Sequence, residues 1–140
     1  MKFLRIAGGR AALLAIVSAT FLAGCATSFE AATPESAVKQ RAQARWDVLL
    51  KYDFDAAFKF TAPSFRAVTP VKSYANRFGS AANWSAAQVV GAICEAERCT
   101  VNVEVTAIPM SQITAGAPVT VNLEEVWVKE AGQWWLYVRR

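Results

Sequence analysis

Apolar residues recur with helical spacing in the first half of the chain and alternate with polar residues in the second half. Spacings of three and four residues place side chains on one face of an α-helix. The first predicted helix has such a stripe, formed by Val38, Ala42, Trp46 and Leu49. Residues 101–106 and 119–123 instead alternate strictly, which is typical of strands with one buried face. The pattern therefore predicts an α+β domain in which the helices precede the strands.

Helix start and stop signals predict three helices in the first half of the domain. Thr33-Pro34-Glu35 combines an N-cap hydroxyl, a proline at the first helical position and an acid in the first turn. Asp53 and Asp55 are explained as capping residues of a second, shorter helix, which we expect to end at Pro63. Thr69-Pro70 repeats the first signal and predicts the start of the third helix.

The second half predicts a curved sheet of four antiparallel strands, with the N-terminal helices packed on one of its faces. The third strand contains an ambiguity, because Glu124 and Glu125 interrupt its alternation. A β-bulge at this point would turn Glu125 to solvent, whereas an unbroken strand would direct Glu125 and Trp127 toward the core. Glutamate is almost never fully buried unless it is paired, so we expect the bulge.

The first 24 residues have the order of an export signal. Basic residues at Lys2, Arg5 and Arg10 are followed by an apolar run over residues 11–23, and small residues precede Cys25. The apolar run is shorter than the roughly 20 residues that a transmembrane helix needs. We therefore interpret residues 1–24 as a cleaved signal peptide and not as a membrane span.

Leu22-Ala23-Gly24-Cys25 resembles the lipobox of bacterial lipoproteins. The resemblance implies cleavage before Cys25, acylation of its thiol by chains such as palmitate, and stable anchoring to a membrane. Residues 25–32 would then be a tether to a domain that spans residues 33–140. Ala26 follows the cysteine, and by analogy with enteric lipoproteins this implies the outer membrane of the bacterial cell envelope, facing the periplasm.

Net charge and composition exclude several classes of function. The chain has 15 Lys and Arg residues against 11 Asp and Glu residues, but three of the basic residues belong to the signal peptide. The mature part is close to neutral, so its composition is no argument for nucleic-acid binding. The chain has no histidine, and two cysteines alone make a poor zinc site, so we predict neither a metal nor a cofactor.

Cys94 and Cys99 are the two cysteines that remain besides Cys25. Exported proteins meet oxidising conditions, in which two nearby cysteines form a disulfide by default. The pair flanks the predicted turn between the first two strands, so a bridge would fix the register of this hairpin. We predict a Cys94–Cys99 disulfide.

Two segments resemble the nuclear transport factor 2-like (NTF2-like, also cystatin-like or SnoaL-like) superfamily. The first runs from Ala44-Arg45-Trp46 to Asp53-Phe54-Asp55-Ala56-Ala57-Phe58, and the second is the final hairpin, residues 125–136. The resemblance covers residues 35–139 and implies a cone-shaped domain with helices on a curved sheet. The superfamily contains enzymes, binding domains and secretion-system parts, so the resemblance implies a fold but does not transfer a function.

Enzymes of this superfamily use an Asp or Glu, a Tyr and often a His inside the cone. In this chain the candidates are Glu125 as a base and Tyr52 or Tyr74 as the donor to an oxyanion. Glu104 lies opposite the valines of its strand, so we expect it in solvent. Without histidine or any nucleophile motif, we expect no catalysis, and acid/base chemistry by Glu125 is the alternative.

The five tryptophans are mainly expected to fill the core of a small domain. Trp134 and Trp135 are neighbours in a strand and must face opposite sides, so at least one should lie away from the core. The candidates for contact with a ligand or partner are Trp84, Trp127, Trp135 and Tyr137.

Three functional classes follow from the sequence. The first is an envelope lipoprotein whose non-catalytic domain binds a protein partner or a small apolar ligand, and this is the class we expect. The second is a small cone-fold enzyme with isomerase-like or dehydratase-like chemistry. The third is a structural accessory of an envelope assembly. The sequence leaves the oligomeric state open, a dimer included.

Overall fold

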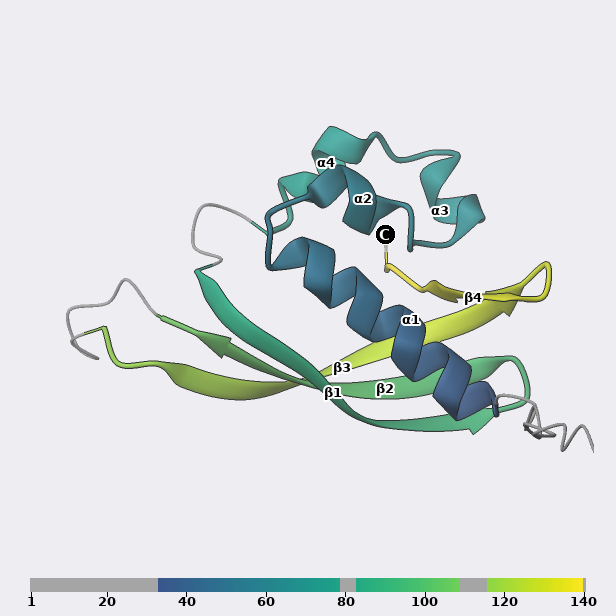
Figure 1. Ribbon diagram of the computed structural model, residues 1–140. Helices are drawn as coiled ribbons and strands as arrows, with labels where there is room; N and C mark the ends of the chain where they lie inside the picture. Colours follow the sequence, from purple (N-terminus) through teal and green to yellow (C-terminus); the bar gives the residue numbers. More distant parts are fainter. Residues whose placement is uncertain (1–32, 79–82, 109–115, 140) are drawn as a thin grey trace, which may run out of the picture. The chain divides into compact units, whose positions relative to one another are not determined.

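The computed structural model describes residues 33–78, 83–108 and 116–139 (Figure 1). The predicted signal peptide, Cys25 and the tether lie outside these residues, so their assignments stay predictions. Within the described residues, no helix is long and apolar enough to cross a membrane.

The longest helix in the described part of the chain is α1 (Pro34–Leu49), and it begins where the sequence predicts. The backbone N–H of Ser36 donates to the Thr33 hydroxyl at 3.2 Å, which satisfies one of the donors at the start of the helix. The four residues of the predicted stripe are all buried: Val38, Ala42, Trp46 and Leu49. Arg45 is buried on the same face.

Three short helices follow: α2 (Phe54–Phe58), α3 (Pro63–Arg66) and α4 (Val71–Ala75). Asp53 caps α2 as predicted, because its carboxylate accepts from the backbone N–H of Ala56 at 2.9 Å. The prediction of three helices is wrong, because the described residues contain four and α3 was not expected. Pro63 does not end α2 but occupies the first turn of α3, a position that proline tolerates well. Thr69 does not cap α4, whose N-cap residue is Pro70 without a side-chain bond.

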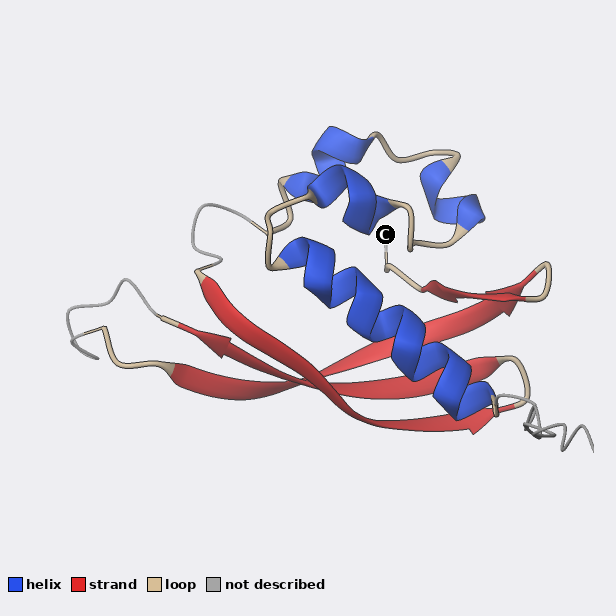
Figure 2. Ribbon diagram, in the orientation of Figure 1, coloured by secondary structure: helices blue, strands red, loops and turns tan. Residues whose placement is uncertain are grey.

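The sheet consists of β1 (Trp84–Glu95), β2 (Arg98–Ala107), β3 (Val119–Glu130) and β4 (Gln133–Leu136). The strands are antiparallel neighbours in the order β1-β2-β3-β4 (Figure 2). Helix α1 lies against one face of this twisted sheet, as Figure 1 shows. The predicted fold class, α+β with helices before a four-stranded antiparallel sheet, is confirmed.

The third strand has no bulge at its two glutamates. β2 and β3 pair without interruption from Arg98 opposite Val128 to Ala107 opposite Val119. The prediction that a bulge turns Glu125 to solvent is therefore wrong, and Glu125 points to the helix-covered face together with Trp127. The register shifts of the sheet lie in β1 instead, one of them between Val89 and Gly91.

The core lies between α1 and the middle of the sheet. Alternate residues of β2 form its floor, and all are fully buried: Cys99, Val101, Val103 and Val105. Trp127 lies opposite Cys99 on β3 and is 0% exposed, and Trp46 of α1 completes the core with 3% of its surface exposed. Because the inward residues of β2 and β3 pair directly, Glu125 lies next to Val101 on the core face.

Cys94 and Cys99 form the predicted disulfide. They are directly paired residues of β1 and β2, with Cα atoms 4.0 Å apart, and the two-residue turn lies just beyond them. The bridge therefore closes the end of this hairpin, and it fixes the register that directs the β2 valines toward the core.

Candidate binding site around Arg45 and Glu125

Helix α1 places an arginine on its buried face. Arg45 lies three residues after Ala42 and next to Trp46, so helical geometry directs it toward the sheet with the apolar stripe. Its side chain is only 5% exposed, and its guanidinium lies 5.4 Å from the centre of the Trp46 ring. A buried guanidinium needs a counter-charge, and β3 supplies one.

Glu125 is the partner of Arg45 and accepts hydrogen bonds from three side chains. Its Oε1 accepts from Arg45 Nη1 at 2.5 Å and from Trp46 Nε1 at 2.9 Å, and its Oε2 accepts from Trp127 Nε1 at 3.0 Å. The Glu125 side chain is 10% exposed. An ionised carboxylate has about four acceptor positions, so three of them are occupied. This arrangement holds Glu125 as a charged structural acceptor.

Tyr74 of α4 extends the cluster. Arg45 Nη2 donates to the Tyr74 hydroxyl oxygen at 3.2 Å. Burial raises the pKa of Tyr74, and the neighbouring Arg45 only partly opposes this effect, so the hydroxyl stays protonated at neutral pH. Because an arginine can only donate, the O–H of Tyr74 remains available to donate to another acceptor.

A pocket of about 400 Å³ opens beside this cluster. Arg45, Tyr74 and Glu125 line its inner part. Its apolar wall is formed by Phe78, Val126, Leu136 and Val138. Such a volume is at the lower end of the range for small-ligand sites.

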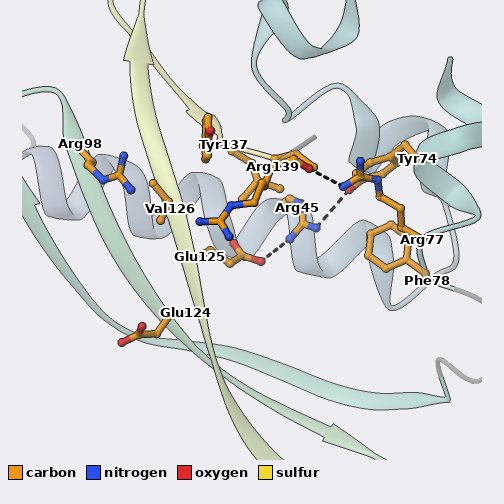
Figure 3. Close-up of a pocket in the computed structure, with 12 residues that line it drawn as sticks. Arg45, Tyr74, Arg77, Phe78, Arg98, Glu124, Glu125, Val126, Tyr137 and Arg139 are labelled. Atoms are coloured by element: carbon orange, nitrogen blue, oxygen red, sulfur yellow. Dashed lines mark hydrogen bonds and ion pairs between the residues drawn. The ribbon is translucent and has the colours of Figure 1, made fainter. Parts of the chain in front are cut away.

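The pocket reaches around the edge of β3. Figure 3 shows Arg77 beside Tyr74 on the helical side, whereas Arg98 and Glu124 lie across the β3 ribbon. Alternation along the strand agrees with this view, because Glu124 faces away from the side that Glu125 occupies. The site is therefore an open groove at the sheet edge and not an enclosed cavity between the helices and the sheet.

Three exposed arginines surround this groove, and we call Arg77, Arg98 and Arg139 the rim arginines. Arg77 Nη1 donates to the backbone oxygen of Arg139 at 3.0 Å, which links α4 to the C-terminal segment. Within residues 33–78, 83–108 and 116–139, no carboxylate forms an ion pair with any of the three. Glu124 lines the same groove, and Glu95 lies opposite Arg98 in the pairing of β1 and β2, so the excess positive charge of the rim is that of Arg77 and Arg139.

The structure brings together two of the three candidate catalytic residues. Glu125 and Tyr74 line the same pocket, but Arg45 lies between them and bonds to both. Tyr52 is absent from the pocket lining and half exposed in the turn after α1, where its φ is 58°. Glu104 is exposed, as predicted.

The aromatic candidates divide between core and surface. Trp127 has no exposed surface and therefore offers nothing for a partner to contact. Trp84 packs edge-to-face on Trp46, with ring centres 5.6 Å apart. Tyr137 is 50% exposed and lines the pocket, so it is the one candidate that is both accessible and at the site.

Trp134 and Trp135 differ as the sequence predicts. Trp134 is buried with 6% of its surface exposed, whereas Trp135 lies on the opposite side and is half-buried. Two arginines cover the Trp135 ring, since the guanidinium groups of Arg41 and Arg66 lie 4.5 and 4.8 Å from its centre. Burial, followed by the charge of Arg66, lowers the pKa of Arg41.

Sequence reasoning missed the arginines of this site. Arg45 could have been recognised from the sequence, because a charged residue within the apolar stripe of a helix requires a buried partner. The rim arginines could not have been recognised in this way, because they are far apart in the sequence and only the folded chain brings them to one groove. Among the described residues, no group of His, Cys, Asp or Glu could hold a metal ion.

No protein-family model and no curated protein matches the chain. Among solved structures, the chain is similar to the SEC-C motif containing protein of Rhodopseudomonas palustris, with 16% identity and a TM-score of 0.55 over 70% of this chain and 73% of that one. This likeness shows a shared fold and nothing about activity.

Two further structures are similar at lower scores. An NTF2 variant with five substitutions is 18% identical, with a TM-score of 0.49 over 71% of this chain and 90% of that one. A protein named as an NTF2-like transpeptidase from Campylobacter jejuni is 9% identical, with a TM-score of 0.44 over 73% of this chain and 98% of that one.

Proposed function

We propose that this protein is a lipid-anchored lipoprotein of the bacterial envelope whose folded domain binds a partner at the groove beside Arg45 and Glu125, without catalysis. The observation that carries the binding part is an open pocket of about 400 Å³ with an apolar wall and a positively charged rim. An accessible apolar surface next to unpaired charges is the usual make-up of a recognition site.

The anchoring part of the proposal is based on the lipobox that ends at Cys25. Acylation of Cys25 would hold the domain at a membrane, and the residues before Thr33 would separate it from the lipid surface. Replacement of Cys25 by Ser removes the acylated thiol. We expect C25S to appear in the soluble periplasmic fraction, and a normally lipid-labelled C25S protein would contradict the proposal.

The absence of catalysis in the proposal is based on how Glu125 is held. Three donors already surround its carboxylate, and one of them is a permanently charged guanidinium. A base must give up such bonds before it takes a proton from a substrate, which raises the barrier of that step. Glu125 therefore serves to neutralise Arg45 and to shape the groove.

The binding part can be tested with a photo-crosslinking amino acid in living cells. Tyr137 and Tyr52 are equally exposed, at 50% each, but only Tyr137 lines the pocket. We expect a crosslinked product when the probe replaces Tyr137, and none when it replaces Tyr52. Crosslinks from position 52 alone, or from neither position, would contradict binding at this groove.

A cone-fold enzyme is the second candidate function, and one observation favours it. Glu125 and Tyr74 line the same open pocket, as an acid/base pair would require. In that case the protein should turn over an apolar carbonyl substrate, and Glu125→Gln should abolish turnover while circular dichroism shows an intact fold. We expect no turnover above background for the unmodified protein.

A further inference from the structure

We propose that the partner at the groove is an extended acidic protein segment that adds to the open edge of β3 as a further strand. This inference depends on the proposed function, because it specifies the chemistry of the partner at the same groove. Strand addition uses main-chain hydrogen bonds for affinity and alternate side chains for specificity.

The first half of β3 has one unpaired edge. β4 pairs only with Trp127–Glu130 of β3, and the last bond at that edge runs from the backbone N–H of Tyr137 to the oxygen of Val126 at 2.8 Å. In an antiparallel strand, every second residue directs its backbone groups to the same edge. Thr120, Asn122 and Glu124 therefore present their N–H and C=O groups at an edge that no strand of the described residues occupies.

The first half of β3 also exposes apolar side chains that a partner strand could cover. Val119, Val121 and Leu123 point to the core face but are 41%, 47% and 39% exposed. Native proteins usually protect an open edge with charged side chains, proline or a bulge. Residues 119–123 contain no charged residue and no proline, and their pairing with β2 has no bulge. An exposed apolar strand of this kind is stabilised when another strand covers it.

The positive charge of the rim arginines favours a partner strand with acidic residues. Arg77 and Arg139 lie where β4 ends and the open edge begins, whereas Arg98 lies on the face of β2 that points away from the core. Within the described residues, no carboxylate forms an ion pair with any of the three. An incoming segment that continues the line of β4 runs antiparallel to β3, so its first residues lie beside Arg77 and Arg139. Acidic residues at that position would neutralise the rim and fix the register of the added strand.

A second copy of this chain fits the edge less well. Two β3 edges that pair antiparallel around Asn122 would place Pro118 of one copy opposite Val126 of the other. Residues 107–118 contain no Asp or Glu, so the segment next to the rim arginines would bring no carboxylate. The charge of the rim therefore favours an acidic partner over self-association.

The test uses three fluorescent probe peptides with the full chain carrying C25S, which avoids detergent. The acidic probe is acetylated and has two aspartates followed by three alternating Val-Thr pairs. The basic probe replaces both aspartates with lysine, and the methylated probe is acidic but carries N-methyl groups on the residues that face β3. By fluorescence anisotropy, we expect the acidic probe to bind about tenfold more tightly than the other two.

Protein variants separate the charge from the edge. Arg77→Gln with Arg139→Gln should weaken binding of the acidic probe about tenfold. Lys39→Gln with Lys72→Gln removes the same charge from exposed residues outside the pocket and should leave binding unchanged. N122P should abolish binding and keep the fold, because its N–H makes no ladder bond.

Two results would overturn the inference. The first is equal binding of the acidic, basic and methylated probes, or binding of none of them. The second is a dimer of the full chain in sedimentation that N122P converts to a monomer, because a second copy would then occupy the edge. If either result occurs while Tyr137 still crosslinks in cells, the groove binds a partner of other chemistry and the proposed function stands.

Discussion

The two halves of β3 have the same alternation and the same pairing with β2, but they differ in what covers them. In the second half, Glu125 and Trp127 point inward and are covered by α1, and β4 pairs with the outer edge. In the first half, Val121 and Leu123 point to the same face and are 47% and 39% exposed. The charged residue is thus buried, and the apolar residues are accessible.

This difference shows that alternation determines the direction of a side chain but not its burial. Burial of Glu125 is possible because Arg45 and two tryptophans donate to it. Exposure of Val121 and Leu123 has no such compensation among the described residues, and the proposed partner strand would cover them.

Replacing Arg45 by methionine should cause the largest loss of stability. The substitution leaves the Glu125 charge buried with only two neutral indole donors, so the free energy of unfolding should fall by about 3 kcal/mol. Urea denaturation measures this change. Lys39→Met, at an exposed position of the same helix, is the control and should change stability by less than about 0.5 kcal/mol.

The double variant Arg45→Met with Glu125→Gln sharpens this test. It removes both charges, so it should be more stable than Arg45→Met alone. If the two variants were equally unstable, Arg45 would contribute through packing and not through neutralising Glu125.

Val105 and Val121 allow a matched comparison of the covered and open parts of the sheet. They are directly paired across β2 and β3, but Val105 is 1% exposed and Val121 is 47% exposed. Val105→Ala should lower the free energy of unfolding by about 2 kcal/mol through lost burial and a cavity. Val121→Ala should change it by less than about 0.5 kcal/mol. Equal losses in denaturation would mean that the first half of β3 is covered in the isolated protein.

The disulfide closes the covered end of the sheet, and its removal should lower stability about as much as Val105→Ala does. Reduction or the pair C94A and C99A should lower the free energy of unfolding by about 2 kcal/mol, because the short loop constrains the unfolded chain. Denaturation with and without reductant measures this loss. The stability of the double variant should not change when reductant is added. If reductant also lowers the stability of the double variant, that loss does not come from the disulfide.

The ionisation of Tyr74 should change the free energy of unfolding less than any of the destabilising substitutions above. Its pKa in the folded state is raised by burial above the ordinary value of 10.0, so the native state favours the protonated hydroxyl. The stability gained in this way is fully present below pH 10 and is lost as pH rises through the raised pKa. Unfolding midpoints above pH 10 should therefore fall more in the wild type than in Y74F. The control Y52F, at an exposed position, should follow the wild type.

Much of the fold could be predicted from residues that are close in sequence. The Thr33 and Asp53 caps and the hairpin with Cys94 and Cys99 all involve partners at most five residues apart. α3 was missed, because Pro63 can either end one helix or begin another, and the choice depends on the surrounding chain. The rim arginines could not be predicted, since α4, β2 and the C-terminal segment meet only in the folded domain.

By itself, the sequence determined the order of helices and strands, the alternation of β3 and the disulfide, because propensity, capping and pairing of neighbours act over short distances. Only the tertiary structure decided whether Glu125 turns inward. The cost of burying a carboxylate depends on its donors, and Arg45 lies 80 residues away in the sequence. The same folding left the first half of β3 open, because β4 ends at Leu136 and covers only the second half.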